Sequence, residues 1–272
     1  MNTEDILNKF ESIGARVKVT KRSSTVTFAS PPLPVTFNIN TDKKGEFFTV
    51  AVDGAPEDVK LDVIDSAPDL RHLLLMLKDK KEKIKYLCGH DERHWFVASL
   101  PLNNSVKTVE DAIESLKPGA VVEALSKNKV KAKHLGNLKG TRYRRNKAFL
   151  RQGEWFFIPT DREIPEKYVL RNEPIRRGRG KPHMCEFLYR EGGRDVYVHR
   201  IHAPNGVTPD EYKRMIKEPN VSEHSWSLMK ADAAVFVKGN IKHPDHSTVY
   251  LDKWCRVFPN RESMAKNVAF LD

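Results

Sequence analysis

The chain has little cysteine and no long apolar run, and these two absences exclude several classes of protein. Its 272 residues include only three cysteines, Cys88, Cys185 and Cys255, an odd number at wide spacing. This is not the spacing of a disulfide framework, so we expect a reducing, cytoplasmic location. No stretch approaches the roughly 18 apolar residues of a membrane-spanning helix. The first residues, MNTEDILNKF, are acidic and amphipathic, and we expect no secretory signal in them.

Familiar catalytic and nucleotide-binding motifs are missing as well. The chain holds no GxSxG, HExxH or GxGxxG pattern, no Walker-type phosphate loop and no paired CxxC. The enzyme and zinc-finger families that depend on those motifs are therefore excluded. Motifs alone leave open whether the protein is an enzyme.

Positive charge is the strongest global property of the chain. Its formal net charge is +11, from 47 Lys and Arg against 36 Asp and Glu. Such an excess favours polyanionic partners, nucleic acid first and acidic membrane surfaces second. We expect DNA or RNA as the partner, with an acidic protein partner or a merely basic soluble protein as the alternatives.

The residue pattern predicts an α+β fold with short antiparallel sheets, a few helices and two mixed subdomains. Short segments rich in Val, Phe and Thr alternate with turn residues, as strands do. Thr108 and Asp111 resemble a capping box, and Pro118 with Gly119 is expected to stop the helix that follows. Helices are expected at 3–14, at 108–117 and after Thr208. Strands are expected at 16–20, 25–29, 35–39, 47–52, 73–77, 84–88, 94–100, 153–159, 184–189, 195–201, 235–241 and 248–251, with 184–189 and 195–201 paired as a hairpin.

A shift in composition divides the chain into three parts. We assign 1–126 to an N-terminal α+β domain, 127–150 to a basic linker or binding arm, and 151–272 to a C-terminal α+β domain. Residues 127–147, KNKVKAKHLGNLKGTRYRRNK, include no acidic residue, and the loop RRGRGK at 176–181 is a second basic segment. Arginine binds phosphate oxygens in pairs, and glycine lets the backbone approach them closely. A solvated basic loop is the alternative. The predicted nucleic-acid contacts are Lys129, Lys131, Lys133, Arg142, Arg144, Arg145, Lys147, Arg176, Arg177, Arg179 and Lys181.

A polar turn between two apolar runs, in KYLCGHDERHWFVASLP, is the first candidate site. Cys88 and His90 are two residues apart and share a strand face, and His94 joins them if the turn folds back. Thiolate and imidazole are natural zinc ligands, but a closed structural site needs four. The missing ligands would come from His183, Cys185, His243 or His246. The predicted metal ligands are Cys88, His90, His94, His243 and His246, for a divalent ion such as zinc or magnesium.

The same turn also fits catalysis. Its imidazoles and carboxylates are general acid–base groups, so His90, Asp91, Glu92 and His94 are the predicted catalytic residues of a metal-dependent nuclease or another phosphoryl-transfer hydrolase. The alternative is a structural turn in which the two acids pair with Arg93. A second candidate, HPDH at 243–246, would let Asp245 orient an imidazole, although Pro-Asp is also common turn chemistry.

Three hypotheses follow from the sequence. The first is a nucleic-acid-binding protein that grips the phosphate backbone, the second a hydrolase acting on nucleic acid, and the third an accessory module for an acidic protein partner.

Overall fold

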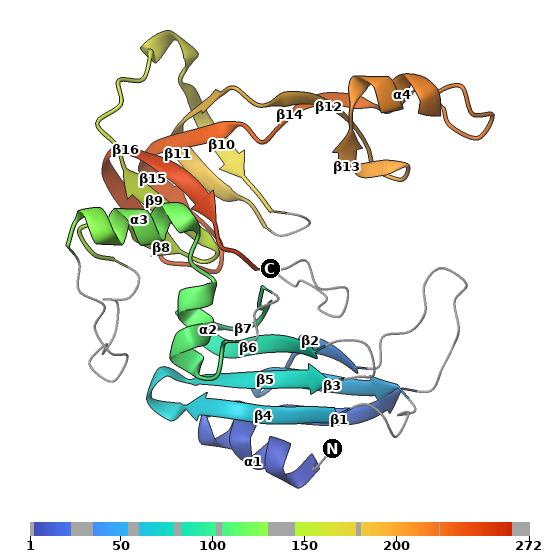
Figure 1. Ribbon diagram of the computed structural model, residues 1–272, viewed down its shortest axis with the longest axis vertical. Helices are drawn as coiled ribbons and strands as arrows, with labels where there is room; N and C mark the ends of the chain where they lie inside the picture. The colour runs from blue at the N-terminus through green and yellow to red at the C-terminus, as the bar shows by residue number, and fades with distance from the viewer. Residues whose placement is uncertain are drawn as a thin grey trace.

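The computed structural model describes residues 3–22, 35–53, 60–78, 83–101, 105–129, 145–177, 181–222 and 224–262. In these residues the chain forms four α-helices and sixteen strands, arranged in four sheets, and the predicted α+β class is confirmed. Figure 1 shows the N-terminal sheets, blue to green, below the C-terminal sheet, yellow to red. The strand expected at 25–29 lies outside the described residues. No helix within the described ranges is long and apolar enough to cross a membrane.

Two sheets make up the N-terminal half. The first contains β1 (Val17–Arg22), β3 (Gly45–Asp53) and β2 (Val35–Asp42) in that order, with β1 parallel to β3 and β2 antiparallel to it. The second is an antiparallel meander of β4 (Lys60–Ala67), β5 (His72–Lys78), β6 (Lys83–Asp91) and β7 (His94–Ser99). The short 3-10 helix η1 (Pro68–Leu70) joins β4 to β5. The strands expected at 73–77, 84–88 and 94–100 are present as β5, β6 and β7, and they pair in chain order.

Helix α1 (Thr3–Ser12) and the two N-terminal sheets share one core. Ile6 and Phe10 lie one helical turn apart and are buried against Phe48 of the first sheet and Leu75 of the second. Leu74, which precedes Leu75 in β5, faces the opposite side of the sheet and is buried under helix α2. Strand β5 is therefore covered on both faces, which explains its continuous run of leucines.

Helix α2 (Val109–Ser115) begins with the predicted capping box. The Asp111 amide donates to Thr108 Oγ1 at 3.0 Å, and the Thr108 amide donates to Asp111 Oδ2 at 3.0 Å. Beyond Pro118 the chain enters a further helix, α3 (Gly119–Lys127), which the sequence pattern left unassigned. This helix buries Val121 against Phe156 of the C-terminal sheet. The chain therefore leaves the core of the N-terminal half and joins the core of the C-terminal half at Pro118, before the composition shift at 127.

The C-terminal half is built on a six-stranded antiparallel sheet. Its order is β10 (Leu170–Ile175), β11 (His183–Glu191), β15 (Ala234–Lys242), β16 (Val249–Pro259), β9 (Trp155–Pro159) and β8 (Leu150–Gln152), and a 3-10 turn, η4 (Glu166–Tyr168), precedes β10. Leu188, Val237 and Cys255 are buried in its core. The two strands expected on either side of 242–247 do pair, as β15 and β16.

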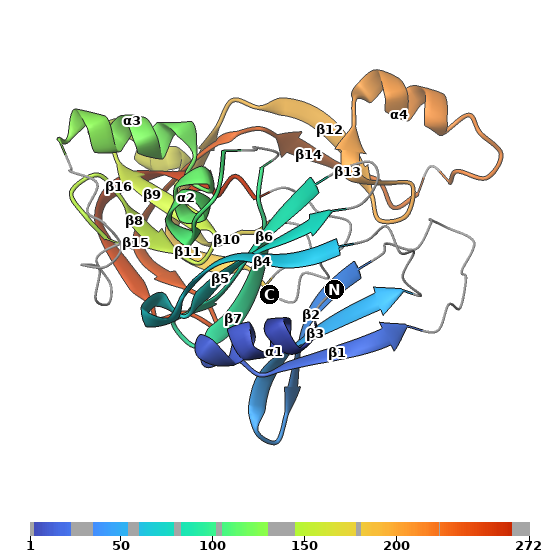
Figure 2. The ribbon, with the colours of Figure 1, turned by 60° about the horizontal axis from the view of Figure 1, so that its bottom comes forward.

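The predicted hairpin between 184–189 and 195–201 is wrong. Strand β11 pairs with β15, whereas β12 (Arg194–His199) pairs with β14 (Ser227–Ala231) and β13 (Ala203–Val207). The pairs Glu191↔Ala234 and Arg194↔Ala231 share one register, so the second strand pair continues the line of the first after an unpaired step at 192–193 and 232–233. Gly193 permits this, because a Cβ there would lie 2.7 Å from the Ala231 carbonyl oxygen. Together with helix α4 (Pro209–Met215), the second strand pair extends as an arm beyond the six-stranded sheet (Figures 1 and 2).

Candidate metal centre

Three histidines from distant parts of the sequence meet at the ends of two neighbouring strands, β11 and β15, of the C-terminal sheet. His183 begins β11, and His243 and His246 lie in the loop that follows β15. Because Met184 pairs with Lys242, the start of β11 lies beside the end of β15. Each histidine offers a ring nitrogen within 4.8 Å of those of the other two, and the group could hold a metal ion. We call these residues the histidine triad.

The triad is buried, and part of its hydrogen-bonding capacity is unused. His183 is 1% exposed, and neither of its ring nitrogens has a hydrogen-bond partner in the described part of the chain. A buried polar group without a partner costs about 1–3 kcal/mol. Gln152 Oε1 and Trp155 Nε1, on the strands next to the triad, are also buried without partners among the described residues. The site therefore has donors and acceptors to spare for a ligand.

His183 is held in the neutral form. Burial, and then the charges of His243 and His246, lower the pKa of His183 to about 3. A metal binds the unprotonated imidazole nitrogen. At neutral pH, no proton has to leave His183 before an ion can bind.

A glycine makes room for the imidazoles. Gly153, in the turn between β8 and β9, has a left-handed φ of 55°, and a Cβ on it would lie 2.8 Å from His246 Nε2 and 3.4 Å from His183 Nε2. The Nε2 atoms of two triad histidines thus face the same small space beside the backbone. Next to it, Gln152 Nε2 donates to the Ser247 carbonyl at 2.6 Å and holds the loop in place.

The third triad residue, His243, is oriented by its own loop. Its Nδ1 accepts a hydrogen bond from the Asp245 amide at 3.2 Å. The carboxylate of Asp245 accepts from Lys181 Nζ at 2.7 and 2.9 Å. Burial alone would raise the pKa of Asp245, but the hydrogen bond and charge of Lys181 lower it. Asp245 is therefore an anion beside the triad.

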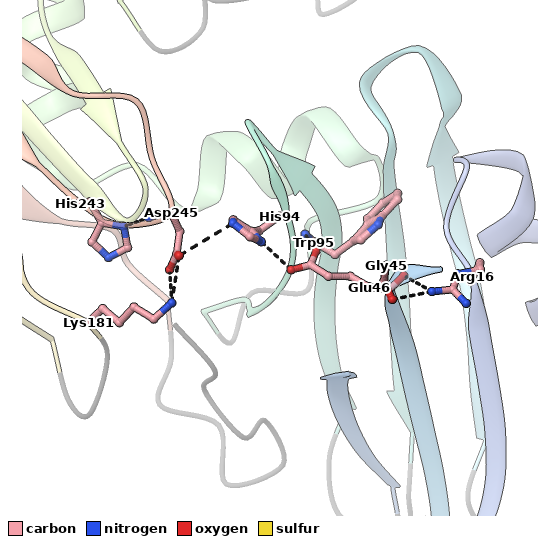
Figure 3. A network of polar contacts seen from close by, with 8 residues as sticks. All are labelled: Arg16, Gly45, Glu46, His94, Trp95, Lys181, His243 and Asp245. Carbon is pink, nitrogen blue, oxygen red and sulfur yellow. Dashed lines mark hydrogen bonds and ion pairs between the residues drawn. The ribbon is translucent and has the colours of Figure 1, made fainter. Parts of the chain in front are cut away.

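A cleft of about 400 Å³ lies between the two halves of the molecule, and the triad reaches it through His246. Asp245 and Lys181 line the C-terminal side, and Asp91 and His94 line the N-terminal side. A polar contact links the two walls (Figure 3): His94 Nε2 lies 3.9 Å from Asp245 Oδ1, while His94 Nδ1 lies 2.5 Å from Glu46 Oε1 on its own side. Asp91 Oδ2 lies 3.6 Å from an Arg151 guanidinium nitrogen.

The turn between β6 and β7 contributes two of the predicted catalytic residues, Asp91 and His94, to the lining of the cleft. Glu92 accepts a hydrogen bond from the Ser247 amide at 2.8 Å, and Asp91 faces Arg151. Both acids of the turn thus contact the C-terminal half. His90 instead packs edge-on against Trp95, with ring centroids 4.9 Å apart, and burial and the charge of Arg71 lower its pKa.

The predicted set of metal ligands is not brought together as a whole. Cys88 is fully buried in the N-terminal core, and burial raises its pKa. This is a correction, because a thiol in an apolar core is not available as thiolate. Among the described residues, the group with metal-ligand spacing contains His243 and His246 but not Cys88, His90 or His94, and His183 completes it. Cys185, the other distant thiol considered, is buried in the C-terminal core, and burial raises its pKa to about 12.

The predicted nucleic-acid contacts fall into three groups. Lys129, Arg145, Lys147 and Arg176 are exposed. Two others are engaged within the fold: Arg177 donates to the carbonyl oxygens of Asn260 and Glu262, at 3.2 and 2.6 Å, and Lys181 pairs with Asp245. The rest lie outside the described residues: Lys131, Lys133, Arg142, Arg144 and Arg179.

No family model, curated protein or solved structure matches the chain. Its function therefore has to be argued from the site itself.

Proposed function

We propose that this protein is a metal-dependent hydrolase in which His183, His243 and His246 hold a divalent transition-metal ion. One observation carries the proposal: three histidines converge in a buried position beside a cleft, and both ring nitrogens of His183 lack partners in the described residues. Catalytic zinc sites use three protein ligands and keep a fourth position open for water or substrate.

The donor atoms favour zinc over magnesium. All three are imidazole nitrogens, which suit zinc, copper, nickel and iron, whereas magnesium and calcium prefer oxygen. In a tetrahedral site with bonds of about 2.0–2.1 Å, ligand nitrogens are about 3.3 Å apart. The triad nitrogens, within 4.8 Å of one another, would have to close by about 1.5 Å at most.

A bound zinc ion would supply a water of lowered pKa as the nucleophile. The residues of this chain have the remaining roles. Asp245 is a carboxylate next to the triad and is the candidate proton acceptor. Lys181 and Arg151 line the cleft and are the candidate binders of an anionic substrate.

A phosphodiester, as in DNA or RNA, is the substrate class we propose. The net charge of +11 favours it. The cleft itself also carries carboxylates, among them Glu46, Asp91 and Glu262, so its own field does not attract phosphate strongly. We therefore expect the metal ion to supply much of the attraction at the site.

Metal titration is the first experiment. Chelator-treated protein is titrated with zinc against a chromophoric competitor, and the bound metal is counted by elemental analysis. We expect one ion per chain in the wild type, and at least 100-fold weaker binding in His246→Gln and His183→Gln, because each loses a ligand. The exposed His224 provides the matched control, His224→Gln, with unchanged binding. Wild-type protein that binds no zinc, or triad variants that bind as well as wild type, would overturn the metal centre.

Hydrolysis is measured separately. Bis(p-nitrophenyl) phosphate and labelled DNA and RNA are incubated with the protein loaded with Zn²⁺, Mn²⁺ or Mg²⁺. Activity that appears with zinc and is lost in His246→Gln is the expected result. Intact substrates under every condition, in protein that binds zinc, would leave a metal centre but refute the hydrolase.

Nucleic-acid binding without cleavage is the second candidate. The observation in its favour is a set of exposed cations, Lys129, Arg145, Lys147 and Arg176, that form no ion pair in the described parts of the chain. Affinity should then fall steeply with salt, because phosphate contacts release counterions. Binding that does not depend on salt, or its absence at low salt, would exclude it, and complexes from lysate that survive nuclease treatment would favour a protein partner.

A further inference from the structure

We propose that Glu92, from the N-terminal half, is a positioning residue of the metal centre in the C-terminal half. Its Oε2 accepts a hydrogen bond from the Ser247 amide at 2.8 Å and lies 3.6 Å from His246 Nδ1. Glu92 and Ser247 are 155 positions apart in sequence, so the tertiary fold alone creates this contact. The inference rests on the proposed function, because it concerns the same metal centre.

The two ring nitrogens of His246 face different surroundings. Nε2 is directed to the space beside Gly153, where His183 Nε2 also points, and Nδ1 is directed to Glu92. A histidine that binds a metal through one nitrogen usually donates the N–H of the other to a carboxylate or carbonyl oxygen. This arrangement fixes the tautomer and the ring plane and makes the imidazole a better ligand. Glu92 is placed to do this for His246.

The distance of 3.6 Å is longer than a hydrogen bond, whose usual range is about 2.7–3.2 Å. When Nε2 binds a cation, the proton of the neutral ring must be on Nδ1, and the ring gains positive charge. Both changes strengthen the attraction between Nδ1–H and the carboxylate. We therefore expect this contact to shorten when the metal binds.

The backbone at Glu92 gives a second reason to assign a role to its side chain. Its φ is 51°, in the left-handed region that glycine and asparagine adopt most readily. A glutamate there fits the β6–β7 turn less well than glycine would. The local geometry of the turn does not explain the residue, whereas the contacts of the carboxylate with Ser247 and His246 do.

It follows that zinc affinity depends on both halves of the molecule. His94, two residues after Glu92 at the start of β7, adds a second link from the N-terminal half to the same loop through Asp245. A chain whose N-terminal half has moved away would keep the three imidazoles but lose the group that orients one of them.

The test compares zinc affinity in three proteins by competition titration: wild type, Glu92→Gln and Glu92→Gly. Glu92→Gln keeps an oxygen that can accept from the Ser247 amide but loses the negative charge, and we expect about 10-fold weaker binding. Glu92→Gly removes the carboxylate and relieves the left-handed backbone, and we expect up to about 100-fold weaker binding. Glu11→Gln, an exposed change of the same charge on α1, is the control with unchanged affinity.

Two further measurements separate positioning from a structural role. Urea unfolding of the metal-free proteins should leave Glu92→Gly close to wild type, because the lost hydrogen bond is offset by the relieved backbone. In zinc-loaded wild type, nitrogen-15 spectra of the imidazoles should show His246 protonated on Nδ1, and this proton should exchange with water faster in Glu92→Gly.

Zinc affinities within twofold of wild type in both variants would overturn the role of Glu92 while leaving the metal centre intact. A loss of affinity explained by unfolding of Glu92→Gly, with Glu92→Gln unchanged, would also overturn it. A wild-type protein that binds no zinc refutes the proposed function instead, so the two failures are distinguishable.

Discussion

Replacing Gly153 by alanine tests whether the space beside this residue is the place where the triad binds its ion. Gly153 has a left-handed φ of 55°, and a Cβ would lie 2.8 Å from His246 Nε2. The left-handed conformation costs an alanine about 1–2 kcal/mol, and forcing a methyl group into a packed site costs about 1–3 kcal/mol more. We therefore expect Gly153→Ala to lower the free energy of unfolding by about 2–5 kcal/mol.

The chain offers a matched control in Gly192. Its φ is 65°, also left-handed, but a Cβ there would meet no atom within 4 Å. Gly192→Ala should therefore cost only the backbone component, about 1–2 kcal/mol. The difference between the two variants isolates the contact with the imidazoles.

Urea unfolding of the metal-free proteins and competition titration with zinc make up the assay. Because a metal site tolerates errors of only about 0.2 Å in its ligand distances, we expect Gly153→Ala to bind zinc about 100-fold more weakly. Gly192→Ala should bind it as tightly as wild type. Equal unfolding free energies and equal zinc affinities in the two variants would refute the reasoning.

Three further predictions concern pH, the His243 loop and the thiols. The pKa of His183 is about 3 in the folded protein, below the value of about 6.5 expected in the unfolded chain. As the pH falls, the unfolded state therefore binds the proton first, and the free energy of unfolding decreases. Between pH 8 and pH 5 the metal-free wild type should lose about 2 kcal/mol more than His183→Gln in urea unfolding, and equal losses would contradict the burial of a neutral imidazole. Zinc bound through either nitrogen of His243 must break the hydrogen bond from the Asp245 amide to His243 Nδ1. Binding through Nε2 moves the ring proton to Nδ1, and binding through Nδ1 occupies the acceptor itself. The Asp245 amide should then exchange faster with deuterium when zinc is bound, and an unchanged rate would exclude His243 as a ligand. All three cysteines are buried, and burial raises their pKa. A thiol reagent should therefore react with them only on the time scale of unfolding. Fast labelling of Cys88 would contradict its place in the core.

Features encoded within a few neighbouring residues could be predicted from the amino-acid sequence. The capping box at Thr108 fixes the start of α2, because both of its partners lie within one helical turn. The run of leucines in β5 indicates a strand covered on both faces, and the loop from His243 to His246 could be identified as a candidate site from its residue types. The α+β class follows from the same local alternation of strands and turns.

Which of these residues share a site depends on the folded arrangement of distant segments. Cys88 follows its strand face into the N-terminal core with Tyr86, so the residue that looked most like a zinc ligand is removed from the surface. His183 meets His243 because two strands some 60 positions apart pair edge to edge, and Glu92 reaches His246 because the two halves close on each other. Strand pairing between distant segments depends on the packing of a whole core, which no local pattern in the chain encodes.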